Sequence, residues 1–318
     1  MQGHTSFNLA TLKRMLFARA FFVNMGKRTS KKTGNDMTIA SAILLLVLGN
    51  FTATVSDVLI KLAGQDIPIF QFIFIRSIFT SLFLLIFYRS INWSNLFVGL
   101  PVHFLRGNIW VLASLCLVLS LQLLPLSTAN AIFYTVPIMI VLLSVLFLKE
   151  RLTALMLCAV IGGFTGVLVI LRPTEINLGA IYALIFSLLL AVSSLLIRKL
   201  PKRQALLHGL WVTQLCAIPL SFALFVWEGT TLNLAMMGYA VGSSLCSIGY
   251  SFCCMKAYSH VPASRIASVE YVGLLFVVFA GWLIFSEALD IWFVIGAALI
   301  IVPIYLLGRH ARKKTLTT

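Results

Sequence analysis

Ten apolar runs of about 20 residues, separated by short polar breaks, constrain this chain more than any other feature of its sequence. A helix of that length crosses the ~30 Å hydrocarbon core of a bilayer. The charged fraction is 10%, well below that of soluble domains, so the lipid bilayer is the expected surrounding. We therefore predict an all-α membrane protein with ten transmembrane helices. The expected spans are 37–63, 68–88, 101–122, 125–148, 153–171, 178–198, 207–227, 233–257, 262–285 and 288–308.

Three prolines, Pro137, Pro219 and Pro303, lie inside these expected spans rather than at their starts. Proline removes one backbone hydrogen bond and its ring crowds the preceding turn. We therefore expect a kink in the span around each of them.

Basic residues cluster in the breaks on one side of the membrane. The chain has 24 Lys and Arg against 9 Asp and Glu, and 19 of the bases fall on the side of the N-terminus. Only Lys61 and Arg172 fall on the other side. This asymmetry is typical of cytoplasmic segments, and it explains the net charge of +15 without a nucleic-acid partner. We expect a multi-pass protein of the plasma (inner) membrane with both termini cytoplasmic.

Two basic tails flank the apolar body, at 1–36 and 309–318. Residues 7–25 could form a basic amphipathic helix on an anionic membrane surface. A solvated tail and a protein that starts at Met37 are the alternatives. The first 30 residues lack the apolar core and the cleavage site of a signal peptide.

The chain repeats itself at an offset of 137 residues. The offset aligns Pro125 with Pro262, Ser127 with Ser264, Tyr134 with Tyr271, and Glu150 with Glu287. Each unit, 37–171 and 178–308, holds five spans, and an odd number inverts the second unit in the membrane. The expected architecture is a 5+5 inverted repeat with a site near the midplane. Glu150 and Glu287 are expected to tie helix ends to neighbouring loops.

Several short motifs recur in a fixed order along the chain. They are Arg76, Leu105-Arg106-Gly107, the run LLPLSTANA at 123–131, Pro137, and Lys149-Glu150-Arg151, with Ala263-Ser264-Arg265, Tyr271 and Ser286-Glu287 in the second unit. The pattern resembles the EamA family of the drug/metabolite transporter superfamily over residues 37–308. The resemblance implies a ten-helix carrier of small organic solutes, such as amino acids and nucleoside-like or cofactor-like metabolites. The basic extension 1–36 departs from the family's usual short start.

An ionisable side chain inside the bilayer costs free energy, so we expect each one to have a partner or a function. Glu270 has no opposite charge one turn away on its own helix. It must pair across helices, bind a cationic group or carry a proton. Arg76 is the expected cross-helix partner, and a purely structural pair is the alternative. Asp57 is the second candidate for coupling transport to protons.

The remaining polar and aromatic candidates follow helical faces that we expect to meet in one central cavity. Aromatic rings can stack on a cationic or aromatic solute, although packing is the alternative for each. Arg106 and Arg265 are expected to lie nearer the cytoplasmic end and could reach the interface. The candidates for solute binding are Glu270, Arg76, Tyr271, Tyr134, Trp110, Arg106, Arg265, Asn50 and Tyr250.

A secondary carrier that works by alternating access is the favoured function. The sequence contains none of the motifs HExxH, GxSxG, GxGxxG or the P-loop, so we expect no enzyme activity and no cofactor. Its six cysteines show no metal-ligand spacing, so we expect no metal. A small-molecule solute is the expected partner, with protons as a candidate coupling ion and a homodimer left open. The alternative is a channel-like protein or a scaffold without active transport.

Overall fold

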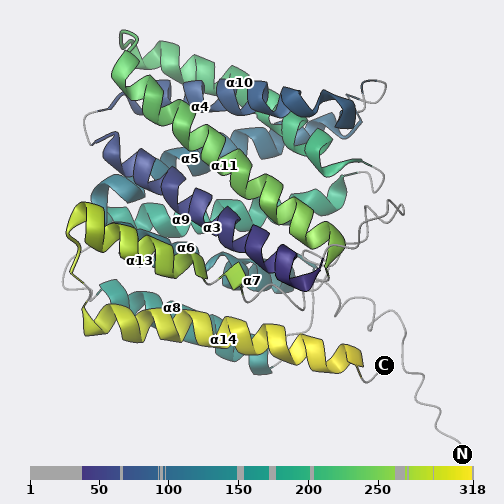
Figure 1. Ribbon diagram of the computed structural model, residues 1–318, viewed down its shortest axis with the longest axis vertical. Coiled ribbons are helices and arrows are strands. Elements are labelled where there is room, and N and C mark those ends of the chain that lie inside the picture. Colours follow the sequence, from purple (N-terminus) through teal and green to yellow (C-terminus); the bar gives the residue numbers. More distant parts are fainter. Residues whose placement is uncertain are drawn as a thin grey trace, which may run out of the picture.

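A computed structural model gives the arrangement of the helices (Figure 1). The residues that it describes are 38–64, 67–91, 93, 96, 98–148, 154–171, 177–200, 204–261, 269–270, 272–288 and 290–316. The basic tail 1–36, Glu150, Arg265 and Tyr271 lie outside these ranges.

The predicted ten spans are confirmed. The first half contains α3 (Ile39–Leu62), α4 (Ile69–Leu84), α5 (Leu100–Leu123), α6 (Leu126–Phe133), α7 (Val136–Leu148) and α8 (Ala154–Leu171). The second half contains α9 (Leu178–Leu196), α10 (Leu206–Glu228), α11 (Leu234–His260), α13 (Val272–Phe285) and α14 (Ile291–Leu316). Helices α6 and α7 together make one span. Short 3₁₀ helices follow α4 at Leu85–Ser90 and α9 at Ile197–Lys199.

Proline has different effects at the three interior positions. The fourth span breaks at Tyr134 and Thr135, just before Pro137, as expected for a residue that cannot donate a backbone hydrogen bond. Helices α10 and α14, in contrast, run through Pro219 and Pro303 without interruption.

The helix boundaries themselves follow the 137-residue offset. The start of α8 at Ala154 maps onto the start of α14 at Ile291, and the end of α5 at Leu123 maps onto the end of α11 at His260. The start of α13 at Val272 also lies within one residue of the position equivalent to the start of α7 at Val136. The two halves therefore share one fold.

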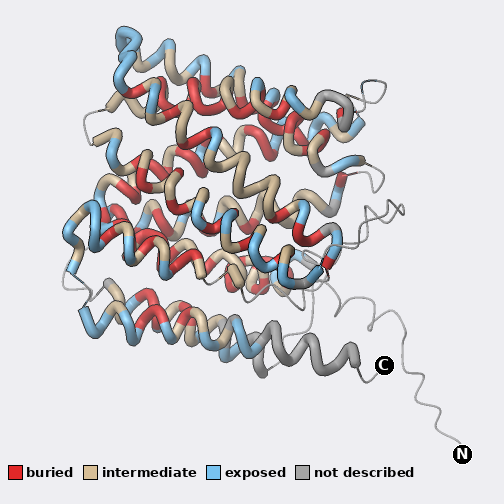
Figure 2. The backbone as a smooth tube through the Cα atoms, viewed as in Figure 1, coloured by how far each residue is buried: buried red, intermediate tan, exposed pale blue. Residues whose placement is uncertain are grey.

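The helices pack mainly across the two halves. Helix α3 packs on α11, and the equivalent pair is α9 on α5. The pairs α4–α10 and α8–α14 map onto themselves when the halves are exchanged. This is the pattern that a two-fold axis between inverted repeats produces. Figure 2 shows the buried residues along the facing sides of these helices and the exposed residues on their outer sides.

Lipid-facing and buried faces explain the composition of the helices. Six helical segments are long and apolar enough to cross a membrane, and large apolar side chains such as Trp227, 78% exposed, lie on their surface. Helix α11 is less apolar because it carries Gly and Ser residues on faces that contact α3 and α4.

Glycine allows the closest approach between helices at α8 and α14. A β-carbon on Gly166 would lie 2.6 Å from the carbonyl oxygen of Gly296, and one on Gly296 would lie 2.6 Å from that of Gly166. Small residues of this kind let membrane helices pack backbone to backbone.

Candidate functional site

Arg76 lies in the middle of α4 with only 5% of its surface exposed. Its Nη2 donates a hydrogen bond of 2.8 Å to the hydroxyl of Ser247 on α11. The guanidinium also lies 5.7 Å from the ring centroid of Trp110 on α5, within range of a cation–π contact. Ser247 is in turn 3.0 Å from the hydroxyl of Ser56 on α3. Both halves of the protein therefore meet at this arginine.

The other two nitrogens of this guanidinium have no hydrogen-bond partner among the described residues. Both Nε and Nη1 of Arg76 are buried and unpaired. Asp57 on α3 lies within electrostatic range, but the two side chains form no ion pair within 4 Å. The Asn130 side chain on α6 lies near the Asp57 carboxylate, and its amide donates to the backbone carbonyl of Leu126 at 3.2 Å. An unpaired buried donor is costly, and these two nitrogens of Arg76 are available to a hydrogen-bond acceptor.

Glu270 lies in a 3₁₀ segment just before α13, and its carboxylate accepts hydrogen bonds from side chains of α11. The hydroxyl of Tyr258 donates to Oε1 at 2.7 Å, and that of Tyr250 donates to Oε2 at 3.5 Å. The Cys254 thiol lies 3.8 Å from Oε1, and the Asn50 side chain also contacts the carboxylate. All of these groups are neutral, so no cation balances the charge of this carboxylate within the part of the chain that the structure describes.

The polar groups around Arg76 and Glu270 share one face of α11. Ser247, Tyr250, Cys254 and Tyr258 follow at spacings of three, four and four residues. These spacings place them in one row along a helix. Arg76 and Glu270 therefore lie along the same row, with Glu270 nearer the C-terminal end of α11.

Tyr134 and Asn50 lie beside the turn that carries Glu270. The Tyr134 hydroxyl donates to the backbone carbonyl of Glu270 at 3.2 Å. A β-carbon on Gly273 would lie 2.7 Å from that hydroxyl and 2.8 Å from the Asn50 side-chain oxygen. Only glycine leaves room for both side chains here.

The expected ion pair between Glu270 and Arg76 is not present. Each side chain is held by a different group of α11, Glu270 by tyrosines and Arg76 by Ser247. Among the described residues, Lys61–Glu287 is the one ion pair within 4 Å.

Arg106 also differs from the expectation that it could reach the interface. It is 7% exposed, and it donates to Ser193 of α9 at 3.4 Å and to Thr213 of α10 at 3.3 Å. His103, one turn before it, lies 3.0 Å from the same Thr213 hydroxyl. The polar face of α5 therefore contacts two different neighbours. Trp110 faces Arg76 of α4, while His103 and Arg106 face α10.

Glu287 fastens the loop after α13 to the start of α6. Its carboxylate accepts from the backbone of Leu126 and Ser127 and from the Ser127 hydroxyl, the latter at 2.8 Å. Lys61, at the end of α3, lies 3.6 Å from the same carboxylate and donates to the carbonyls of Leu121 and Leu124. We call Lys61, Glu287 and their partners the Glu287 latch. The tying role expected for Glu287 is what the structure shows.

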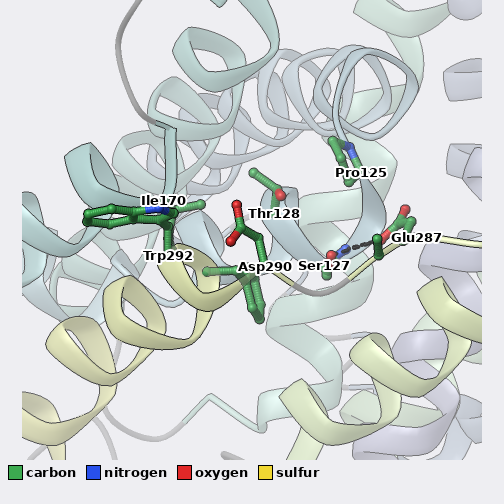
Figure 3. A pocket seen from close by; sticks show the side chains of 9 residues that line it. Pro125, Ser127, Thr128, Ile170, Glu287, Asp290 and Trp292 are labelled. Atoms are coloured by element: carbon green, nitrogen blue, oxygen red, sulfur yellow. Dashed lines mark hydrogen bonds between the residues drawn. The ribbon is translucent and has the colours of Figure 1, made fainter.

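A small pocket of about 160 Å³ lies beside the Glu287 latch (Figure 3). Its wall includes Thr128 of α6, Asp290 before α14 and Trp292 of α14. In Figure 3 the side chains of Thr128 and Asp290 point toward one another. This pocket lies away from Arg76 and Glu270, none of whose contacts it shares.

Sequence reasoning missed two residues of this site. Tyr258 makes the shortest bond to Glu270, and Ser56 lies beside the hydroxyl of Ser247. Continuing the row from Tyr250 by two further turns of the helix would have found Tyr258. The described residues contain no group of three or more His, Cys, Asp or Glu side chains that could hold a metal ion.

Known transporters resemble this chain over most of its length. Residues 40–172 and 177–309 each match the EamA-like transporter family. The pseudopaline exporter CntI of Pseudomonas aeruginosa is 29% identical over 278 residues, which are 85% of this chain and 97% of the relative. The S-adenosylmethionine uptake transporter of Rickettsia prowazekii is 26% identical, covering 88% of this chain and 96% of that protein.

Two more distant similarities agree with these. The riboflavin transporter of Vibrio cholerae is 25% identical over 71% of this chain and 74% of its own length. A solved crystal structure covers 86% of this chain and 98% of its own with a TM-score of 0.55. At 16% identity, that structure supports the fold alone.

Proposed function

The chain belongs to the EamA-like transporter family, and on that premise we propose that it is a secondary active transporter of a small organic metabolite. The relatives carry names of transporters, with solutes as different as pseudopaline, S-adenosylmethionine and riboflavin. Transport of a small solute across a membrane is thus the shared activity. Which solute, and in which direction, differs among these relatives, because one is an exporter and another an uptake transporter.

One observation supports the site most strongly. The buried guanidinium of Arg76, on a helix of the first half, contacts Ser247 on a helix of the second half and keeps two unpaired nitrogens. Solute sites of inverted-repeat transporters lie between the halves, where residues of both halves can contact the solute. We propose that the solute binds between Arg76 and Glu270, beside Trp110 and Tyr250.

Alternating access requires that one end of this site closes while the other opens. The Glu287 latch joins α3, α5 and α6 of the first half to the loop after α13 of the second half. The distribution of Lys and Arg favours an outer position for this end, with both termini cytoplasmic in the plasma membrane. The latch then closes the outer side in this conformation, and the halves must separate there to open it.

Proton coupling is proposed for Glu270, with Asp57 as a second carrier. The Glu270 carboxylate is held by the hydroxyl of Tyr258, and among the described residues neither carboxylate forms an ion pair within 4 Å. A carboxylate in this setting can exchange a proton as the surroundings change between the two conformations.

The test is transport by purified protein in proteoliposomes loaded with a defined mixture of metabolites and followed by mass spectrometry. We expect saturable exchange by the wild type and its loss in Arg76→Gln and Glu270→Gln. Lys199→Gln and Asp290→Asn are the matched controls, since each removes one charge from an exposed residue outside the site. Full exchange by both site variants would contradict the assignment. Flux that never saturates would favour the channel-like alternative.

The orientation has its own test, which is a fusion of alkaline phosphatase or a fluorescent protein to the C-terminus. A cytoplasmic end keeps the fluorescent protein bright and the phosphatase inactive. An active phosphatase would reverse the proposed orientation and leave the solute site unaffected.

A further inference from the structure

We propose that the solute is a zwitterion whose carboxylate binds Arg76 and whose cationic amine faces Glu270, with the two charges several bonds apart. This inference rests on the proposed transport function and adds the chemical class of the solute to it.

Arg76 provides the anion-binding end. A guanidinium has five N–H donors and accepts no hydrogen bond. Ser247 accepts from one of these donors, while Nε and Nη1 are buried and have no acceptor among the described residues. Asp57 lies within electrostatic range of Arg76, but the two side chains form no ion pair within 4 Å. The free donors Nε and Nη1 lie on different edges of the guanidinium, and each edge also includes Nη2, which has a second N–H besides the one given to Ser247. A planar carboxylate can therefore bind one edge through two parallel hydrogen bonds, as arginine commonly binds carboxylates.

Glu270 provides the cation-binding end. Tyr250, Tyr258 and Cys254 hold its carboxylate in place, and the described part of the chain places no cation within 4 Å of it. A buried carboxylate is costly unless a cation pairs with it. An ammonium group is the simplest partner, and the Tyr250 ring beside Glu270 can contribute a cation–π contact.

The distance between the anion-binding end and the cation-binding end follows from the positions of their partners along α11. Ser247, which bonds Arg76, precedes the three residues that bond Glu270, namely Tyr250, Cys254 and Tyr258, by three, seven and eleven residues. At 1.5 Å per residue these separations are roughly 4.5, 10 and 16 Å along the helix axis. An α-amino acid bears its ammonium and carboxylate groups on the same carbon, so it spans less of this row than a solute whose two charged groups are separated. The fitting solute has an amine and a carboxylate separated by a chain or ring.

The test uses zwitterions of increasing length as probes on the full-length purified protein. Glycine, 4-aminobutyrate and 6-aminohexanoate differ only in the distance between their charges, and hexylamine and hexanoate each keep one charge of the longest. Binding is followed as a rise in Tm, and exchange is followed in proteoliposomes with the metabolite mixture. We expect 6-aminohexanoate to raise Tm by roughly 4 °C or more at saturation, with little effect of glycine or the single-charge probes.

The variants separate the two ends of the site. Arg76→Gln and Glu270→Gln should each abolish the shift caused by 6-aminohexanoate, whereas Lys199→Gln and Asp290→Asn should retain it. Arg76→Lys should retain only part, since lysine cannot offer two parallel donors. An equal shift with hexylamine, or a shift that survives Arg76→Gln, would overturn the inference.

Transport distinguishes failure of this inference from failure of the proposed function. If the protein exchanges only solutes that lack a carboxylate or an amine, the zwitterion assignment is wrong and transport stands. If the folded protein exchanges no component of the mixture, the proposed function itself fails.

Discussion

The hydroxyl of Tyr134 donates a hydrogen bond of 3.2 Å to the backbone carbonyl of Glu270. Tyr134 lies at the break between α6 and α7, and Glu270 lies in the 3₁₀ segment just before α13, at the position equivalent to Phe133. The contact therefore joins corresponding regions of the two halves. This contact holds the turn that carries Glu270 against the other half, so a movement between the halves would also move the Glu270 carboxylate.

The fit around this contact can be tested at Gly273. A β-carbon there would collide with the Tyr134 hydroxyl and the Asn50 side chain at 2.7 and 2.8 Å. We expect Gly273→Ala to lower the free energy of unfolding by about 1–3 kcal/mol, because one of the two must move. Thermal unfolding in detergent measures it. Gly238→Ala in α11 is the control, since no atom lies within 4 Å of that position, and it should be neutral or slightly stabilising.

Tyr258 should matter more than Tyr250 for the function of Glu270. The Tyr258 hydroxyl lies 2.7 Å from the carboxylate and the Tyr250 hydroxyl 3.5 Å. A hydrogen bond to a charged group contributes about 1.5–3 kcal/mol, so we expect Tyr258→Phe to slow exchange roughly tenfold or more. Tyr250→Phe should have the smaller effect on the initial rate in proteoliposomes. The reverse order would mean that the shorter bond does not hold the working conformation of Glu270.

Thr213 should be structural, unlike the residues around Arg76. Its hydroxyl lies within hydrogen-bond distance of both His103 and Arg106. Thr213→Val should therefore lower the free energy of unfolding by about 1–3 kcal/mol by leaving buried groups unpaired. The KM for the transported solute should stay unchanged. Ser194→Ala, which removes a hydroxyl bonded only within its own helix, is the control. A large increase in KM would instead bring Arg106 into the solute site.

The Glu287 latch should control access from its own end. Lys61→Gln removes the ion pair but leaves the Glu287 bonds to Leu126 and Ser127, so the fold should persist. We expect the halves to separate there more often. A cysteine introduced by Thr128→Cys, beside the latch, should then react faster with a membrane-impermeant thiol reagent. The same cysteine with Lys61 intact gives the reference rate, and equal rates would show that the ion pair does not keep this end closed.

Much of the fold was predictable because hydrophobic length and the 137-residue offset are properties of the sequence itself. The spans, the break at Pro137 and the role of Glu287 follow from them. Individual residues of the site were predictable from the sequence, but the contacts between them were not. Arg76, Trp110, Glu270 and Tyr250 stand out as polar or aromatic groups in apolar helices.

The partners of these residues depend on how each helix is rotated, and sequence periodicity does not fix that rotation. Residues on one face of α5 contact two different helices, because Trp110 contacts α4 and Arg106 contacts α10. Likewise Glu270 faces Tyr258 rather than Arg76, because the turn before α13 directs it toward α11. Small hydroxyl groups such as Ser247 look like ordinary packing residues until their partner is seen.

Alternating access between the two halves is tested most directly by locking the Glu287 latch. The variant carrying Lys61→Cys and Glu287→Cys replaces the ion pair, whose atoms lie 3.6 Å apart, with a site for a thiol-specific bifunctional cross-linker. We predict exchange in proteoliposomes before cross-linking and after reversal, and loss of exchange while the cross-link is present. Each single-cysteine variant should be insensitive to the reagent. Undiminished exchange by fully cross-linked protein would contradict alternating access by separation of the halves at this end.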